Sequence, residues 1–319
     1  MGNFYRYFII LCTLMLLTGC TPPTVLPPTS TTGAPTATQP EPETPTRPAV
    51  ETTLPASTET QTARPATATA LPVFTPTPDL RQPPEDWQNW PIVPRVSARA
   101  IEIYQTGLAL GNNPLAFSKV GDCQSISEVL MGIYDQPMYY DRFDGEPDIQ
   151  ETIRQFAGSF GRDGVAVNGG FNAAAVLSPI WADPDLCEAG ETPIECEYRI
   201  NRPSIVIISL EVWWEGRTPE HYEQYMRQII EFFIERGTLP ILATKADNVE
   251  GDHSINLTTA RLAYAYDIPL WNFWSAAQPL PYHGMDPNRD DGFHIAPETW
   301  GTRSVTALRT LSAVWHAVK

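Results

Sequence analysis

Two side chains near the C-terminus have the types and spacing of an acid–base pair. Asp291 precedes His294 by three residues, in Asp291-Gly-Phe-His294, just ahead of a predicted final helix. At this spacing a loop carboxylate can orient an imidazole and stabilise its charged form, as the acid of a catalytic triad does. The pair is therefore a candidate general base with its orienting acid, although an Asp and a His at this spacing also arise by chance.

The elements that would position this pair alternate along the chain. The unbroken β-branched run at 204–210 is typical of a buried parallel strand, and an apolar face at helical spacing marks a helix at 219–236. Further strands are predicted at 115–120, 164–168, 239–244 and 269–272, and further helices at 97–110, 148–160, 256–266 and 297–317. Strands alternating with helices predict a parallel five-stranded α/β sheet with helices on both faces.

Ligands of such sheets bind beyond the carboxyl ends of the strands. That rule brings Gly121-Asp122-Cys123, Asn168-Gly169-Gly170 and the loops after Leu210 and Thr244 to one rim. We therefore expect the functional site at this edge.

Together these motifs resemble the SGNH (GDSL-type) hydrolases over most of residues 115–319. The resemblance rests on Gly121-Asp122 after the first strand, an Asn-containing turn after the second, and the final Asp-x-x-His. It implies a three-layer, flavodoxin-like domain that hydrolyses esters, here of a carbohydrate or a lipid. Cys123 stands where the family has its nucleophilic serine, His294 would be the general base and then the acid, and Asp291 would hold His294.

The oxyanion groups that the resemblance implies are altered. The backbone N–H groups of Cys123 and Ala173 would serve, although Ala173 falls where the family has glycine. In the third block, Trp213 replaces the family's Asn, and Glu211 nearby would oppose a developing negative charge. Losing one oxyanion donor typically costs about 10²–10³ in rate. The alternative is therefore a degenerate domain of the same fold that binds a cell-surface glycan or peptide without cleaving it.

The cysteines leave several assignments open. Cys187 and Cys196 flank a short polar loop and are predicted disulfide partners, which leaves Cys123 over. Cys123 can instead be a buried structural thiol, or pair with one of those two cysteines. Ser125 is a poorer nucleophile candidate, because it lies two residues further on and should point elsewhere.

The rim offers more cleft candidates. Asn248 could supply the missing oxyanion donor and Lys245 could bind a substrate carboxylate, but a plain polar turn is the favoured explanation of both. Other candidates are Asp122, Asn168, Gly170 and Trp213. Stacking on a sugar or acyl chain, or burial in the core, would account for Trp213, Trp214, Trp271 and Trp274. A metal site from Asp252, His253, Asp290 and His294 has no spacing that fixes its geometry, so we expect neither metal nor cofactor.

The N-terminal region predicts export and tethering. Residues 1–19 read as a secretory signal peptide, and Leu17-Thr18-Gly19-Cys20 resembles the lipobox of bacterial lipoproteins, which implies a lipid on Cys20. Residues 20–84 are Thr/Pro-rich, predicting a disordered linker before a folded domain at 85–319. We expect a cell membrane location on the extracytoplasmic side. The net charge of −16 argues against a nucleic acid partner.

Overall fold

The computed structural model describes residues 81–210 and 218–319. The predicted signal peptide, Cys20 and most of the predicted linker lie outside the described residues. So does the loop of residues 211–217, which contains Glu211, Trp213 and Trp214.

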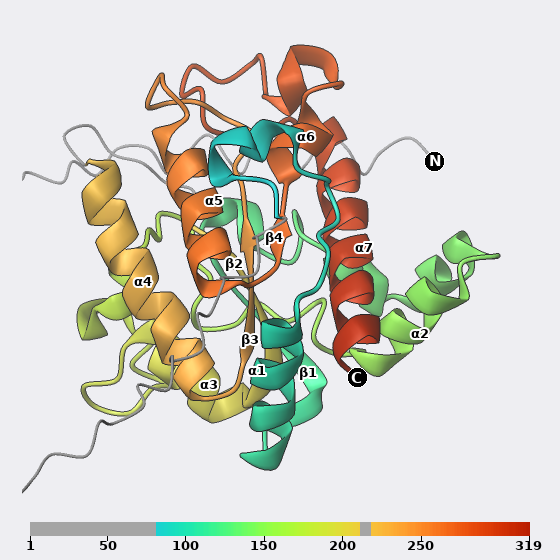
Figure 1. The fold of residues 1–319 in the computed structure, drawn as a ribbon, viewed down its shortest axis with the longest axis vertical. Coiled ribbons are helices and arrows are strands. Elements are labelled where there is room, and N and C mark those ends of the chain that lie inside the picture. The colour runs from blue at the N-terminus through green and yellow to red at the C-terminus, as the bar shows by residue number, and fades with distance from the viewer. Residues whose placement is uncertain (1–80, 211–217) are drawn as a thin grey trace, which may run out of the picture. The chain divides into compact units, whose positions relative to one another are not determined.

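Four parallel strands form one sheet in the order β1-β2-β3-β4 (Figure 1). Pairing of Val120 with Ile208, and of Leu242 with both Ile208 and Leu270, brings the carboxyl ends of the strands to one edge. The strands are β1 (Asn113–Gly121), β2 (Pro203–Ser209), β3 (Leu239–Ala243) and β4 (Leu270–Trp271). The predicted mixed α/β class with a parallel sheet is confirmed.

The predicted strand at 164–168 is not a strand in the structure. Val167 forms one isolated parallel bridge with Gly121, at the outer edge of β1. The N–H of Val165 donates to the buried carboxylate of Glu197, and the N–H of Val167 turns back to Gly164 O. Because these two donors are used elsewhere, the segment runs beside β1 without forming a ladder, and the sheet has four strands among the described residues.

Seven α-helices surround the sheet within the described residues. α1 (Ala98–Ala109) packs against α7 (Trp300–Val318), and α4 (Pro219–Glu235) packs against α5 (Ser254–Tyr266). Figure 1 shows these two pairs separated by the strands. The others are α2 (Pro147–Gln155), α3 (Pro193–Asn201) and α6 (Phe273–Ala277). Short 3-10 turns are η1 (Pro84–Asn89), η2 (Cys123–Ser125), η3 (Gly132–Asp135), η4 (Pro137–Phe143), η5 (Ala175–Leu177), η6 (Pro179–Trp181), η7 (Pro281–Gly284) and η8 (Pro297–Thr299).

Side-chain caps explain where several helices begin. The Thr218 side chain accepts a hydrogen bond from the N–H of His221, which starts α4 where the sequence predicts it. Thr192 and Glu195 form a reciprocal capping box at the start of α3, a helix that the sequence analysis did not predict. α2 ends at Gln155, five residues before its predicted end.

The first described residues form a strap along the side of the domain. Arg81 binds Asp267 and Tyr264 O at the C-terminal end of α5, which lies at the amino end of β4. η1 then places the ring centroid of the buried Trp87 4.9 Å from that of Trp274, and Asn272 Nδ2 donates a hydrogen bond to Trp87 O. Of the helices in the described part of the chain, none has the length and hydropathy needed to cross a membrane.

Candidate functional site

Three side chains form a relay at the carboxyl edge of the sheet. Cys123 Sγ lies 3.3 Å from His294 Nε2, and His294 Nδ1 lies 2.8 Å from Asp291 Oδ2. The thiol is partly exposed, and the side chains of His294 and Asp291 are 28% and 38% exposed. The structure therefore brings the three predicted triad residues within hydrogen-bond reach of one another in the order that nucleophilic catalysis requires.

The loop that carries His294 is closed by backbone pairing. Met285 and Ile295 form an antiparallel bridge, and the N–H of Asp286 donates to His294 O. Gly292 has φ +63°, a conformation that favours glycine, and it folds the loop so that His294 turns back over Asp291. Contacts within residues 285–295 therefore help to orient the imidazole of His294.

Asp291 is held as a carboxylate. Burial alone would raise its pKa. The opposing hydrogen bonds from the N–H groups of His294 and Phe293, and from Arg289, bring the pKa well below its usual range. Asp291 therefore stays ionised throughout the neutral range, as an acid that orients a histidine must.

The turn that carries Cys123 follows directly from β1. The buried Asp122 side chain accepts a hydrogen bond from the N–H of Gln124, which starts the 3-10 turn η2. At Gly121 a Cβ atom would lie 2.7 Å from Ser209 O, so only glycine lets β1 approach β2 this closely. Asp122 thus shapes the turn and does not line an open cleft.

Arg303 locks this turn from α7. Its side chain is fully buried, with Nε donating to Gln124 O at 3.0 Å and Nη2 donating to Ser209 Oγ at 2.8 Å. The same guanidinium lies over the rings of Phe273 and Trp271. α7 therefore ties the ends of β1 and β2 together beneath the thiol.

The turn at 168–170 lies beside the thiol. The N–H of Asn168 donates to Gly121 O, and a Cβ atom placed on Gly169 would lie 3.8 Å from Cys123 Cβ. Asn168 and Gly170 are exposed at this turn, whereas Ala173 is buried further along. The N–H of Ala173 donates no hydrogen bond to any other described residue, so it remains a candidate oxyanion donor.

A small cavity of about 90 Å³ opens next to the relay. Its walls carry the polar side chains of Gln124, Asp286 and Arg289 together with apolar ones. The lining residues are Cys123, Gln124, Val129, Asp286, Arg289, His294, Ile295, Pro297 and Trp300. A space of this size admits a group of a few non-hydrogen atoms or about three waters.

The loop after β3 does not join the relay. Lys245 is buried and donates to Asp247 at 2.6 Å and to Glu250. Its ammonium is therefore engaged within the protein and not offered to a substrate carboxylate. Asn248 accepts a hydrogen bond from the N–H of His253, as a turn residue would. These two predicted cleft residues have the roles that the plain polar turn predicts.

Trp271 and Trp274, the two described members of the predicted tryptophan set, are likewise packing residues. Trp271 is fully buried, with its Nε1 donating to Thr306, and Trp274 packs edge-on against Trp87. In the described part of the chain, Asp252, His253, Asp290 and His294 do not gather as a metal-binding group.

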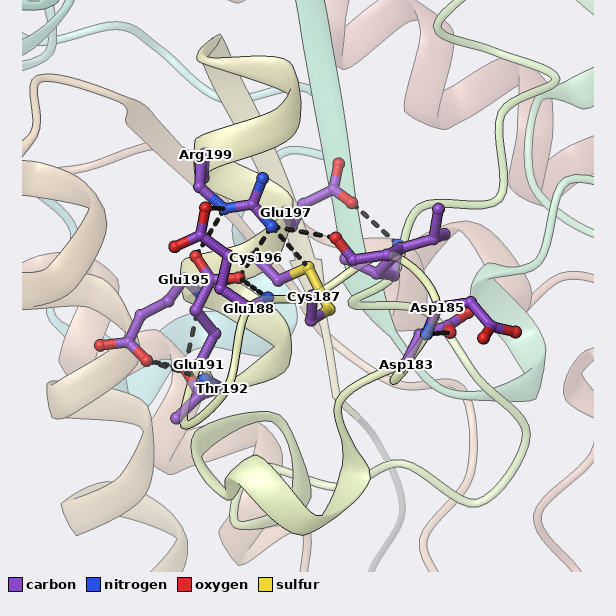
Figure 2. Close-up of a disulfide and its surroundings, with 12 residues drawn as sticks. Asp183, Asp185, Cys187, Glu188, Glu191, Thr192, Glu195, Cys196, Glu197 and Arg199 are labelled. Carbon is purple, nitrogen blue, oxygen red and sulfur yellow. Dashed lines mark hydrogen bonds and ion pairs between the residues drawn. A yellow bond between two sulfur atoms is a disulfide. The ribbon is translucent and has the colours of Figure 1, made fainter.

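A disulfide joins Cys187 and Cys196 at the start of α3 (Figure 2). Arg199 lies over it and binds Glu191 through two nitrogens, at 2.7 and 2.8 Å. Because these two cysteines pair with each other, Cys123 forms no disulfide within the described part of the chain, and the alternative in which it pairs with either of them is excluded.

Three residues at the site were missed from the sequence. Gln124 and Arg289 line the cavity beside the relay and Arg303 binds Gln124 O, yet none belongs to the motif that drew attention to its neighbours. Arg289 is only two residues from Asp291, so proximity was a usable signal. Arg303 reaches the site from a helix interior and carries no local signal.

No known family model matches this chain, and no curated protein is recognisably similar to it.

Proposed function

We propose that this domain is an SGNH-like hydrolase that cleaves esters through Cys123, His294 and Asp291. The observation that carries the proposal is the relay of 3.3 Å from Sγ to Nε2 and 2.8 Å from Nδ1 to Oδ2. The position of residues 164–168 outside β1, next to Gly121, supports the flavodoxin-like arrangement. The substrate would be a carbohydrate or lipid ester outside the cell, reached by a domain tethered through a lipid on Cys20.

In the proposed reaction His294 Nε2 removes the thiol proton as Sγ attacks the ester carbonyl. The N–H groups of Cys123 and Ala173 stabilise the oxyanion, and protonated His294 then gives its proton to the departing alcohol. The resulting thioester is hydrolysed by water, for which His294 is again the base. Asp291 keeps the imidazole in the tautomer that presents Nε2 to sulfur.

The test is hydrolysis of short-chain chromogenic esters by the full mature chain. We expect Cys123→Ala and His294→Ala each to lower kcat/KM by at least about 10³-fold. His221→Ala, an exposed histidine on α4, is the matched control and should leave the rate unchanged. A wild type no faster than both site variants across several acyl lengths would remove the esterase proposal.

The second candidate is a binding module of the same fold for a cell-surface glycan or peptide. It is favoured by Arg289, whose Nε binds the same Asp291 oxygen that holds His294, at 3.0 Å. This cation partly neutralises the carboxylate on which the base depends. In that case glycan or peptide binding persists in Cys123→Ala, and no acyl adduct forms on the wild type.

A further inference from the structure

Gln124 has an unusual position beside the relay. Its side chain is 2% exposed, and its Nε2 donates to Phe293 O at 3.1 Å, which connects the turn of the thiol to the loop of the base. Its Oε1 is buried and accepts no hydrogen bond within the described structure. Since a buried acceptor without a donor is costly, this atom calls for a ligand that brings an N–H or O–H group.

The orientation of the amide follows from its surroundings. If the two amide atoms were exchanged, Oε1 would face Phe293 O and two acceptors would meet. Nε2 therefore belongs at Phe293 O, which leaves Oε1 as the unpartnered atom.

Gln124 lines the same cavity as Cys123 and His294. The second acceptor there is Asp286, whose Oδ1 is already bonded to Asn288. Gln124 Oε1 and the Asp286 carboxylate are both acceptors, and Arg289 is the cation that lines the cavity with them. This combination disfavours an anionic ligand. The volume of about 90 Å³ is ample for water, which needs two to four polar partners and finds them here.

We propose that Gln124 is a positioning residue that holds the water which hydrolyses the acyl-enzyme. This inference rests on the proposed function. One O–H of the water donates to Gln124 Oε1, and the other donates to His294 Nε2. His294 removes that second proton as the water oxygen bonds to the acyl carbon. The carbon–sulfur bond then breaks, the thiolate takes the proton back from His294, and the carboxylic acid leaves.

The separation of the two half-reactions tests this role. With excess p-nitrophenyl acetate, the burst of p-nitrophenol reports acylation, the later steady rate reports deacylation, and intact-mass spectrometry reports the acetyl adduct. We expect Gln124→Met to slow deacylation about tenfold, the effect of about one lost hydrogen bond, with a much smaller effect on the burst. The adduct should then accumulate. Gln228→Met, an exposed glutamine on α4, is the matched control.

A second variant separates this role from a merely structural one. Gln124→Glu in its protonated form can still donate to Phe293 O and accept from water, so the ratio of deacylation to acylation should stay near the wild-type value. If Gln124→Met lowers both steps equally, or neither, Gln124 acts only through the loop and the proposal is overturned. If the wild type shows neither burst nor adduct, the proposed function itself fails, and this inference fails with it.

Discussion

The Asp291 carboxylate binds two side chains, His294 and Arg289, which affect its role in different ways. Its Oδ2 accepts from His294 Nδ1 and from Arg289 Nε, while its Oδ1 accepts two backbone N–H groups. The backbone bonds fix the carboxylate in place, so the imidazole finds its acid already oriented. Arg289 adds stability to the ionised form but draws charge away from the histidine. The carboxylate of Asp291 is therefore held in a fixed orientation, but its pairing with Arg289 weakens its attraction for a protonated His294.

Asp291→Asn should lower kcat/KM by about 10³–10⁴-fold, because an amide can present its NH₂ to Nδ1 and so favour the wrong tautomer. Asp290→Asn, at the adjacent exposed position, is the control and should change little. The measurement is ester hydrolysis at pH 7 to 8. A loss of less than tenfold for Asp291→Asn would contradict a triad role.

At the scale of elements, the strands that are buried on both faces could be predicted from the sequence. The prediction is wrong where contacts with distant residues determine whether a segment pairs as a strand. The run Ile205–Ile208 is β-branched and fully buried, so its pattern and its structure agree. Residues 164–168 have a similar pattern, but Glu197 from α3 takes the N–H of Val165. That contact comes from 32 residues away, and no local pattern contains it. α3 itself had a readable signal in the Thr192 and Glu195 box, which was overlooked.

The residues of the candidate site also fall into two groups, those that the sequence could predict and those that it could not. The three residues of the proposed triad could be predicted because the motifs of the family that the chain resembles mark them and their order. The roles of Lys245 and Trp271 could not, since burial and pairing with distant residues determine them. Trp213 lies outside the described residues, and its assignment stays a prediction.

α7 should contribute to stability through one buried cation. Arg303→Met leaves Gln124 O and Ser209 Oγ without their donor, and hydrogen bonds to charged groups are each worth about 1.5–3 kcal/mol. We expect a loss of about 3 kcal/mol or more in the free energy of unfolding. Arg309→Met on the same helix removes only an exposed pair with Glu146, worth about 0–1 kcal/mol. Urea unfolding compares the two, and equal losses would contradict the role of Arg303.

β1 carries a buried lysine whose charge opposes folding. Desolvation lowers the pKa of Lys119 to about 8, although Asp163 lies 4.0 Å away. Between this value and the unfolded pKa of about 10.4, the unfolded chain binds more protons, so stability rises with pH across this window. The gain from pH 7 to pH 10 should be about 2–3 kcal/mol.

Lys119→Met should abolish this rise, whereas Lys319→Met, a partly exposed lysine at the C-terminus, should retain it. Urea unfolding at several pH values up to 10 measures the slope. Higher pH is avoided, because burial raises the pKa of Tyr134, which makes stability fall with pH once tyrosines ionise. A slope that is the same in wild type and Lys119→Met would refute the assignment.

At the scale of the whole molecule, we expect the disulfide to raise the free energy of unfolding by a moderate amount and to leave the rate of ester hydrolysis unchanged. Cys187 and Cys196 are nine residues apart, and closing a loop of this length constrains the unfolded chain by about 2.5 kcal/mol. The double variant Cys187→Ser with Cys196→Ser should lose about that amount in urea unfolding and retain its ester hydrolysis rate. A large loss of rate would show that α3 supports the relay, contrary to this expectation.

The strap at the start of the described chain has a consequence for orientation. Arg81 is fixed at Asp267, at the amino end of β4, whereas Cys123 follows the carboxyl end of β1. Arg81 and the proposed relay therefore lie at opposite ends of the parallel strands. If the chain is anchored through Cys20, as we propose, tension would reach the domain at Arg81, and the end of the strands that carries Cys123 would point away from the surface that holds the lipid.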